Sequence, residues 1–383
     1  MTSQVTIIGC GVVGAVLAYE LSKVADEADL QIVVLEAASH PARGSTGAAL
    51  GVLMAACSQT MRGHLVMLRL ASLCHYDRLV DELAAATEQE IPYHRGILCL
   101  YGDSEAAARC QTLIPYREAQ GFPLHWLSQP DLGVQYPQFQ VSGGLYSPCD
   151  RTIHPTKFVQ SLVKASERNG VQFRWNCPIA SLQDLPEDLS HSHSDSNWIV
   201  ITAGMGANAL LAPLLPTLLP TQCSTDEPDA ELLQAVGGQA IAVHVPNLNL
   251  RQVVHAEPSE GPYINIVPLG SDRYWVGATV EFEATQSNQQ LPMEANIPLL
   301  LESAIAFCPD FAKAKVLETW AGDRPRPKAN KAPILGFLPH HPHVLVAIGH
   351  YRNGMLMAPI TAQITRDLIL HGKSDLPWQK FSL

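Results

Sequence analysis

The sequence predicts an α/β protein in which a parallel sheet is interrupted by a second, largely antiparallel α+β region. The chain opens with an apolar strand, a glycine turn and an apolar helix, VTIIGCGVVGAVLAYELSK, and continues into a second apolar strand, LQIVVLEA. Together they form a βαβ unit of about 30 residues, which requires a right-handed crossover between parallel strands. Hairpin-like strands later in the chain predict the antiparallel region.

The individual elements follow from the spacing of apolar residues and from glycine and proline punctuation. The opening unit comprises strands at 5–8 and 30–37 and a helix at 13–21. The next elements are a small-residue loop at 43–53, a helix at 65–86, short strands around a helix near 106–120, an amphipathic helix that ends at Gly170, and strands at 171–179 and 198–204 that rejoin the first sheet. A polar surface turn is expected at 186–197 and an acidic loop at 221–231. The last elements are antiparallel strands at 237–245, 262–269 and 274–282, a helix near 297–307, a strand at 343–349 and a helix at 359–370.

These elements suggest two domains. The first is a discontinuous nucleotide-binding domain made of residues 1–85, 147–215 and 320–383. The second is an inserted substrate domain made of residues 86–146 and 216–319. The chain of 383 residues is 47% hydrophobic and only 16% charged, which is enough apolar material for two cores.

Charge and hydropathy exclude some partners. The net charge of −11 argues against binding to nucleic acid or to an anionic membrane through bulk electrostatics. No uninterrupted apolar stretch reaches the ~18 residues of a membrane-spanning helix. We therefore expect a protein without a membrane span and without a nucleic-acid partner.

The cysteines and histidines form neither a disulfide nor a metal pattern. Nine cysteines are scattered without a CxxC pair, so we expect buried thiols in a reducing, cytoplasmic compartment. The histidine clusters, HSH at 191–193 and PHHPH at 339–343, lie in polar or proline-rich turns without neighbouring cysteine or carboxylate ligands. We therefore expect no metal site.

The first glycine turn has the spacing of a dinucleotide-binding motif. Gly9, Gly11 and Gly14 make GxGxxG directly between a strand and a helix. The first glycine permits the tight turn, the second lets the backbone approach a pyrophosphate, and the third allows close helix packing. Glu36 ends the second strand about 20 residues later, where an acid is expected to bind ribose hydroxyls. The alternative is a glycine turn used only for packing.

The segment after Glu36 bears on which dinucleotide is bound. No basic residue replaces or immediately follows Glu36, which disfavours the extra phosphate of NADP. The motif itself does not distinguish FAD from NAD. The loop RGSTG at 43–47 offers hydroxyl and backbone N–H groups that could reach the phosphates and ring of a long flavin dinucleotide. The alternative is a plain flexible loop.

Further motifs are spread in a fixed order along nearly the whole chain. They are IIGCGVVG, Glu36, STGAALG, TIHPTKF, VITAG, VGATV, WAGDRP, PILG and GHYRNGMLMAP. In this set and order the chain resembles the D-amino-acid-oxidase superfamily of FAD-dependent oxidoreductases, and most of all glycine oxidase of thiamine biosynthesis. The resemblance implies a Rossmann-like FAD-binding domain and a bound, non-covalent FAD. Cys57 and Cys308 lie outside the family's covalent linkage motifs.

The resemblance assigns cofactor-binding residues to four parts of the chain. The ADP-binding motif comprises Gly9, Gly11, Val12, Val13, Gly14, Glu36 and Ala37. The loop that passes the pyrophosphate and ring comprises Arg43, Ser45, Thr46, Gly47, Leu50, Gly51 and Val52. Ile179 would lie near the adenine, with Ala203 and Gly204 near the phosphates. The loop that closes over the pyrimidine end of the flavin comprises Gly349, His350, Arg352, Asn353, Gly354 and Met355.

On the substrate side, two positions depart from the glycine-oxidase pattern. Val280 stands where that enzyme carries a methionine beside the substrate, and Asn265 stands where it carries a tyrosine near the substrate carboxylate. Tyr263 lies two residues before Asn265 on the same strand face and could take the tyrosine's place. These departures leave the identity of the substrate open.

Two arginines match the family's charged groups. Arg324 in WAGDRP matches the carboxylate-binding arginine, and the planar fork of a guanidinium suits that task. The alternatives are a surface arginine, or Arg326 in the same role. Arg352 would place positive charge at the flavin edge, with a structural salt bridge as the competing interpretation. His350 is expected to pack in the loop rather than to act as a base.

The resemblance thus implies an enzyme that oxidises the C–N bond of a small amino acid or amine, such as glycine, sarcosine or a D-amino acid. Hydride transfer from the α-carbon to flavin N5 would give an imine and then an oxo acid, with hydrogen peroxide if the enzyme is an oxidase. Alternatives are a dehydrogenase of the same fold that passes electrons to a quinone or carrier, a non-catalytic flavin-binding partner protein, and a nicotinamide dehydrogenase. A homo-oligomer is left open.

Overall fold

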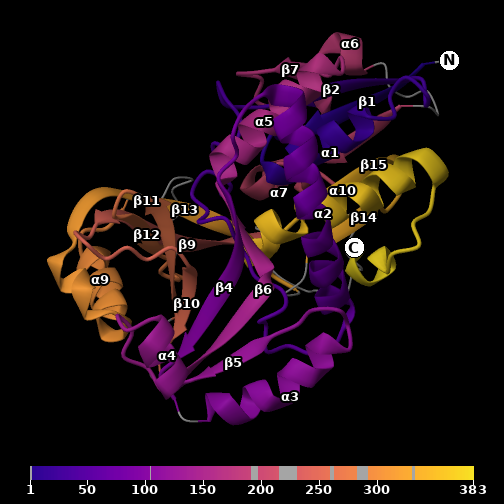
Figure 1. Cartoon of the computed structure of the whole chain (residues 1–383). Coiled ribbons are helices and arrows are strands. Elements are labelled where there is room, and N and C mark those ends of the chain that lie inside the picture. Colours follow the sequence, from indigo (N-terminus) through magenta and orange to yellow (C-terminus); the bar gives the residue numbers. More distant parts are fainter. Residues whose placement is uncertain are drawn as a thin grey trace, which may run out of the picture.

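The computed structural model of the protein describes residues 2–103, 105–190, 197–214, 231–258, 263–282, 292–329 and 333–383. Two sheets organise these residues, one of six strands and one of nine (Figure 1). The described ranges leave out residues 191–196, half of the polar turn expected at 186–197, and nearly all of the acidic loop expected at 221–231. None of the described helices is both long and apolar enough to cross a membrane.

The six-stranded sheet confirms the βαβ unit and extends it. In spatial order its strands are β14 (Ile334–Leu338), β15 (His341–Ile348), β8 (Trp198–Ile201), β1 (Ser3–Ile8), β2 (Leu30–Leu35) and β7 (Gln172–Arg174). All neighbouring strands are parallel except β14 and β15, which form a hairpin. Residues 5–8 and 32–35 are buried, which explains why β1 and β2 are continuous apolar runs.

Four helices pack on one another over this sheet (Figure 1). They are α1 (Val12–Ser22), α2 (His64–Thr87), α5 (Pro155–Arg168) and α10 (Gly354–His371). Every residue of α1 is buried, so its apolar sequence reflects a position in the middle of the helical layer. α5 ends close to Gly170, as predicted.

Helix α10 begins earlier than the predicted start at 359. The prediction treated Pro359 as a helix boundary, whereas Pro359 lies inside the helix. A proline cannot donate to the carbonyl four residues before it, which here belongs to Met355. The Tyr76 hydroxyl of α2 donates to that carbonyl instead. A contact from a neighbouring helix therefore satisfies the acceptor that the proline leaves open.

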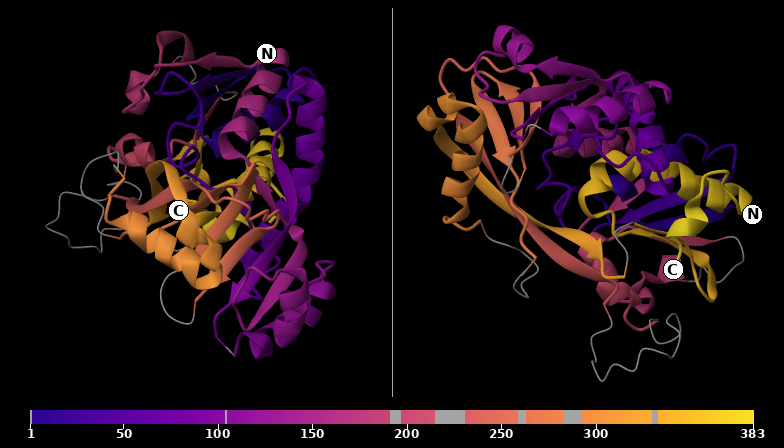
Figure 2. Two further views of the ribbon diagram at one scale, coloured as in Figure 1. Left: turned by 60° about the vertical axis from the view of Figure 1, so that its left-hand side comes forward. Right: turned by 90° about the horizontal axis from the view of Figure 1, so that it is seen from below.

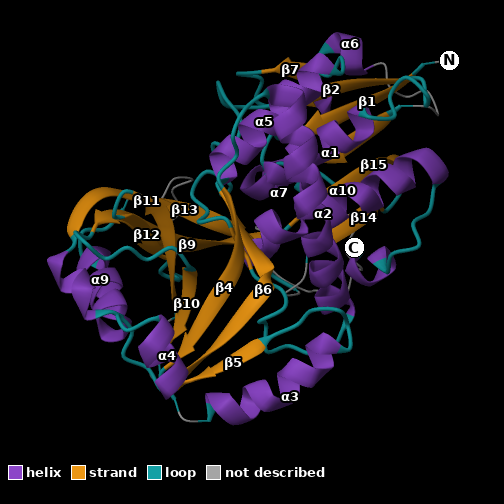
Figure 3. Cartoon of the chain, viewed as in Figure 1, coloured by secondary structure: helices purple, strands orange, loops and turns teal. Residues whose placement is uncertain are grey.

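The nine-stranded sheet is antiparallel at every pairing except β4 with β10, which confirms the largely antiparallel prediction. In spatial order its strands are β13 (Lys315–Pro327), β9 (Leu233–His244), β12 (Arg273–Gly277), β11 (Ile264–Gly270), β10 (Val253–Glu257), β4 (Tyr93–Tyr101), β6 (Gly143–Ile153) and β3 (Val52–Leu53), with β5 (His125–Ser128) also paired to β6. Figure 3 shows α3 (Ala106–Glu118), α4 (Gln129–Gln135) and α9 (Asn296–Phe307) around its margin.

The remaining described elements are short. They are α6 (Glu187–Ser190), α7 (Ala207–Leu211) and the 3₁₀ turns η1 (Leu182–Asp184), η2 (Gly204–Gly206), η3 (Pro309–Lys313), η4 (Tyr351–Asn353) and η5 (Trp378–Phe381). The domain boundaries expected at 146/147 and 319/320 fall within β6 and β13. The division into two domains at those residues stays a prediction.

Strand β13 was not predicted, although it is the longest strand described. It contains Gly322, Pro325 and Pro327, which are typical of a loop. β13 lies at the edge of its sheet, where proline is tolerated because one side of the strand needs no partner. Its pairing with β9 extends from Lys315 to Pro327, and the two strands run together from the second sheet to the first (Figure 2).

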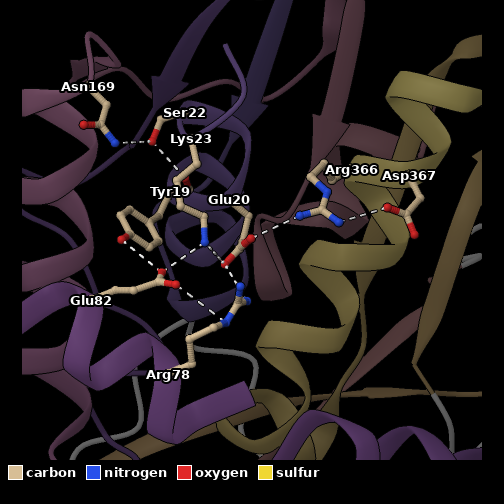
Figure 4. A network of polar contacts seen from close by, with 9 residues as sticks. All are labelled: Tyr19, Glu20, Ser22, Lys23, Arg78, Glu82, Asn169, Arg366 and Asp367. Atoms are coloured by element: carbon tan, nitrogen blue, oxygen red, sulfur yellow. Dashed lines mark hydrogen bonds and ion pairs between the residues drawn. The ribbon is translucent and has the colours of Figure 1, made fainter. Parts of the chain in front are cut away.

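A buried carboxylate ties three helices of the first layer together (Figure 4). The Glu20 side chain of α1 is 6% exposed. It accepts a hydrogen bond from Lys23 at 2.8 Å, and one from Arg366 of α10 at 3.2 Å. Arg78 of α2 lies 3.6 Å from the same carboxylate. Glu82 of α2 shares Lys23 and Arg78 but is 32% exposed.

We predict that Glu20→Gln lowers the free energy of unfolding by about 1–3 kcal/mol, because three cations lose their buried partner. Glu82→Gln is the matched control and should cost less than about 1 kcal/mol, because its side chain is more exposed to solvent than that of Glu20. Urea unfolding followed by circular dichroism measures both. Equal losses of unfolding free energy in the two variants would contradict the conclusion that Glu20 holds the three helices together.

Candidate functional site

A cavity of about 2630 Å³ is lined by residues from both sheets. The glycine turn after β1, the ends of β8 and β15, and residues of β10 to β13 all contribute to its wall. With the exception of Gly14, every site residue predicted from the sequence lines this cavity. They are Gly9, Gly11, Val12, Val13, Glu36, Ala37, Arg43, Ser45, Thr46, Gly47, Leu50, Gly51, Val52, Ile179, Ala203, Gly204, Tyr263, Arg324, Gly349, His350, Arg352, Asn353, Gly354 and Met355.

The glycine turn leaves the start of α1 open. Gly9 has φ +105°, a conformation that other residues rarely adopt. A Cβ atom at Gly14 would lie 2.1 Å from the Gly9 carbonyl oxygen, so Gly14 allows α1 to pack closely on the turn. Gly11 caps α1 without a side chain, and the Val12 N–H donates to the Thr46 hydroxyl at 3.1 Å. The predicted loop therefore lies beside the helix N-terminus.

The Glu36 carboxylate is held at the end of β2, beside the same turn. It accepts hydrogen bonds from the backbone N–H groups of Cys10, at 2.7 Å, and Ala38, at 2.9 Å. An ionised carboxylate has about four lone-pair sites, so two remain for the hydroxyl groups of a ligand. Glu36 is thus oriented before any ligand arrives.

Arg324 is supplied by β13 and oriented by backbone carbonyls. Its Nη1 donates to the Gly237 oxygen at 2.7 Å and its Nη2 to the Thr279 oxygen at 3.2 Å. A Cβ atom at Gly238 would lie 2.1 Å from Nη2, so this glycine makes room for the guanidinium. Burial lowers the pKa of Arg324, but a guanidinium stays protonated in proteins. No carboxylate among the described residues forms an ion pair with it.

The neighbours of Arg324 differ from it in position. Arg326 stacks on the rings of Phe282 and Tyr351, at 5.6 and 5.8 Å, and does not line the cavity. Asp323 lines the cavity, and its buried Oδ1 atom makes no hydrogen bond. Burial and the Glu281 carboxylate raise the pKa of Asp323, although Arg324 opposes this.

The turn after β15 presents one cation and buries one histidine. The Arg352 guanidinium lies over the rings of Tyr263, at 5.1 Å, and Tyr351, at 5.2 Å, and pairs with no carboxylate among the described residues. His350 is buried, and its Nε2 lies 2.9 Å from the Thr361 hydroxyl. Burial lowers the pKa of His350 to about 4, so the ring is neutral at pH 7 and anchors the turn to α10.

The sequence analysis missed a polar row on the cavity face of the second sheet. His255 and Glu257 of β10 line the cavity beside Asn265 of β11. The alternation in VVHAE, with apolar residues between polar ones, was the signal for a strand with one polar face. That signal is only five residues long, and β10 was not predicted.

The sequence analysis also missed the segment 55–61, part of which lines the cavity. The Asp150 carboxylate accepts hydrogen bonds from the N–H groups of residues 55, 56 and 57. The fully buried Arg117 donates to four carbonyls between residues 56 and 61. No local sequence pattern predicts this arrangement, because Asp150 and Arg117 lie far from residues 55–61 in the sequence. Of the described residues, no group of three or more histidine, cysteine or acidic side chains is arranged to hold a metal ion.

Comparisons with known proteins agree with this geometry. A model of the DAO family, "FAD dependent oxidoreductase", matches residues 4–368. The chain is 26% identical to the glycine oxidase of Geobacillus kaustophilus over 385 residues, which covers 99% of this chain and 96% of that protein. It is 29% identical to the bifunctional protein ThiO/ThiG of a Synechocystis species, covering 97% of this chain and 52% of that protein. The chain therefore spans about half the length of such bifunctional relatives.

Solved structures give the same fold. The crystal structure of glycine oxidase from Geobacillus kaustophilus has a TM-score of 0.83 and 24% identity, covering 100% of this chain and 99% of that chain. The residues present also fit a flavin dinucleotide, because a glycine turn, the N-terminus of α1 and an oriented carboxylate line one cavity. On the family match across residues 4–368, the chain belongs to the DAO family of FAD-dependent oxidoreductases.

Proposed function

We propose that this oxidoreductase oxidises the C–N bond of a small amino acid or amine of the glycine, sarcosine or D-amino-acid type. One observation carries the proposal: Arg324 and Arg352, with no carboxylate partner among the described residues, line the same cavity as the dinucleotide turn. Two cations that form no ion pair with a described carboxylate, in a cavity that would hold a redox cofactor, suit a substrate that brings its own carboxylate. Imine hydrolysis would then give an oxo acid, with hydrogen peroxide if oxygen is the electron acceptor.

The proposed cofactor contacts follow the cavity wall. Gly9, Gly11 and the start of α1 would receive the pyrophosphate, and Glu36 the ribose hydroxyls. The remaining lining residues predicted from the sequence would hold the adenine, the phosphates and the ring. When bound, FAD would supply the two-electron acceptor that the oxidation of the substrate C–N bond requires.

Arg324 would bind and orient the substrate carboxylate. Its two hydrogen bonds to carbonyls fix the plane of the guanidinium and leave other N–H groups free for the substrate. Because the guanidinium is already desolvated and held in place, little conformational entropy is lost when the carboxylate binds. Arg352, held over two aromatic rings, would add positive charge where negative charge develops during the reaction.

The proposed reaction is tested by mixing the FAD-bound protein anaerobically with glycine, sarcosine, D-alanine, D-proline and L-amino acids. We expect at least one of the first four to bleach the flavin absorbance. Reoxidation of the bleached protein by air, followed by stopped flow, then distinguishes an oxidase from a dehydrogenase. A flavin that none of these compounds reduces would argue against amino-acid oxidation.

We predict that Arg324→Ala lowers kcat/KM by about 100- to 1000-fold while FAD stays bound, because the carboxylate loses its charged anchor. Arg324→Lys should recover only part of the activity, since an ammonium lacks the planar fork. Arg326→Ala is the matched control and should change kcat/KM less than about threefold. Near-normal turnover by Arg324→Ala would show that the substrate is anchored elsewhere.

A further inference from the structure

We propose that Asn265 donates a second hydrogen bond to the substrate carboxylate, and that His255, held by Glu257, sets the orientation of its carboxamide. This inference rests on the proposed function and deepens it. It makes the substrate an amino acid rather than a simple amine. It also assigns a positioning role to two residues of β10.

The three side chains are brought together by strand pairing. His255 of β10 is the register partner of Asn265 of β11, and Asn265 is the register partner of Gly277 of β12. Side chains at directly opposed positions project from the same face of a sheet. Here that face is the wall of the cavity, which His255, Glu257 and Asn265 all line.

The contacts of Asn265 determine which way its carboxamide points. Its Nδ2 atom lies 3.4 Å from the Gly277 carbonyl oxygen, and its Oδ1 atom lies 3.0 Å from His255 Nδ1. A carbonyl oxygen only accepts hydrogen bonds, so the amide nitrogen must face Gly277. Oδ1 then faces His255, and the imidazole Nδ1–H donates to it. The second N–H of Nδ2 remains for a ligand in the cavity.

His255 cannot turn away from this arrangement. The side chain is nearly fully buried, and its Nε2 atom lies 3.3 Å from Glu257 Oε1. Its ring also packs against the ring of Tyr263, with the centroids 4.8 Å apart. The imidazole is therefore held between Asn265, Glu257 and one aromatic ring, and it donates to both oxygen atoms only when the ring is protonated. A flipped Asn265 amide would place a nitrogen against the imidazole N–H and an oxygen against the Gly277 carbonyl, losing both hydrogen bonds.

Asn265 and Arg324 are anchored on the same short segment. Asn265 donates to the carbonyl of Gly277, and Arg324 donates to the carbonyl of Thr279, two residues further on. Ala278 and Val280, which alternate with them, line the cavity. A carboxylate offers about four acceptor sites on two oxygens, enough for a guanidinium and a carboxamide together. Tyr263, which lies between His255 and Arg352, would then shape the wall beside the carboxylate.

Binding of acetate to the FAD-bound protein tests this directly, because acetate carries the carboxylate and cannot be oxidised at an amine. Perturbation of the flavin absorption spectrum gives the dissociation constant. Asn265→Ala should raise it about tenfold, the effect of one hydrogen bond to a charged group. Asn265→Asp keeps the shape but faces the ligand with a negative charge, and should raise it about 100-fold.

A double-mutant cycle separates positioning from general structural damage. His255→Phe keeps a ring against Tyr263 but cannot donate to Asn265, so it should weaken acetate binding several-fold. Glu257→Gln should weaken acetate binding to a smaller extent. In the Asn265→Ala background, His255→Phe should have no further effect. His125→Phe is the matched control, since this exposed residue of β5 does not line the cavity. Each variant must retain the flavin spectrum of the folded protein.

Three results would overturn the inference. The first is a wild-type protein that does not bind acetate. The second is equal acetate affinity in the wild type and Asn265→Ala. The third is an effect of His255→Phe on acetate affinity that is equally large in the wild-type and Asn265→Ala backgrounds. The inference and the proposed function can fail separately, because acetate binding needs no turnover. If acetate binding depends on Asn265 but no amino acid reduces the flavin, the carboxylate site stands and the proposed reaction is wrong.

Discussion

The pairing of β9 with β13 is the interaction on which the site depends. Their register is continuous from Lys315 opposite His244 to Pro327 opposite Leu233, apart from one irregularity near Val316. Leu233 is buried in a core cluster that also contains residues of the first sheet. Strand β9 therefore contributes to the cores of both sheets. Its pairing with β13 places Arg324 at the cavity that the glycine turn also lines, so a change in register would remove the arginine from the site.

The neighbourhood of the β9–β13 pair also explains how the buried guanidinium of Arg324 is tolerated. Taking a guanidinium out of water is unfavourable unless its N–H groups find acceptors. In this chain the hydrogen-bond acceptors are two backbone carbonyls rather than a carboxylate, and the Glu281 and Asp323 carboxylates act on the guanidinium only through longer-range electrostatics. Gly238 makes this arrangement of Arg324 possible, because any side chain at position 238 would occupy the position of the guanidinium. Neutral acceptors and a nearby glycine together hold the guanidinium without a hydrogen-bonded carboxylate, as the proposed binding of an anionic substrate requires.

Local motifs were enough to predict many of the residues that line the cavity, because each motif is a short stretch with its own physical requirement. The GxGxxG turn and Glu36 belong to one βαβ unit and need no distant partner to be recognised. The part of the cavity wall that the second sheet forms depends on contacts between residues that are distant in sequence. His255 meets Asn265 only through strand pairing, and β10 also pairs in parallel with β4, more than 150 residues away in sequence. Likewise, Asp150 holds the segment 55–57 through hydrogen bonds that no periodicity reveals.

The distribution of charge within the cavity differs from that of the chain as a whole. The protein carries a net charge of −11, which repels a free carboxylate at long range. Inside the cavity, Arg324 and Arg352 present positive charge in a partly desolvated environment, where electrostatic interactions are stronger than in water. Glu257 and Glu36 also line the cavity, but each is already engaged, one with an imidazole and the other with backbone N–H groups. Asp323 and Glu318 line the cavity as well, so acidic groups are also present in its wall. Among the described residues, however, neither Arg324 nor Arg352 forms an ion pair with a carboxylate, and this favours a ligand whose own carboxylate faces the two arginines.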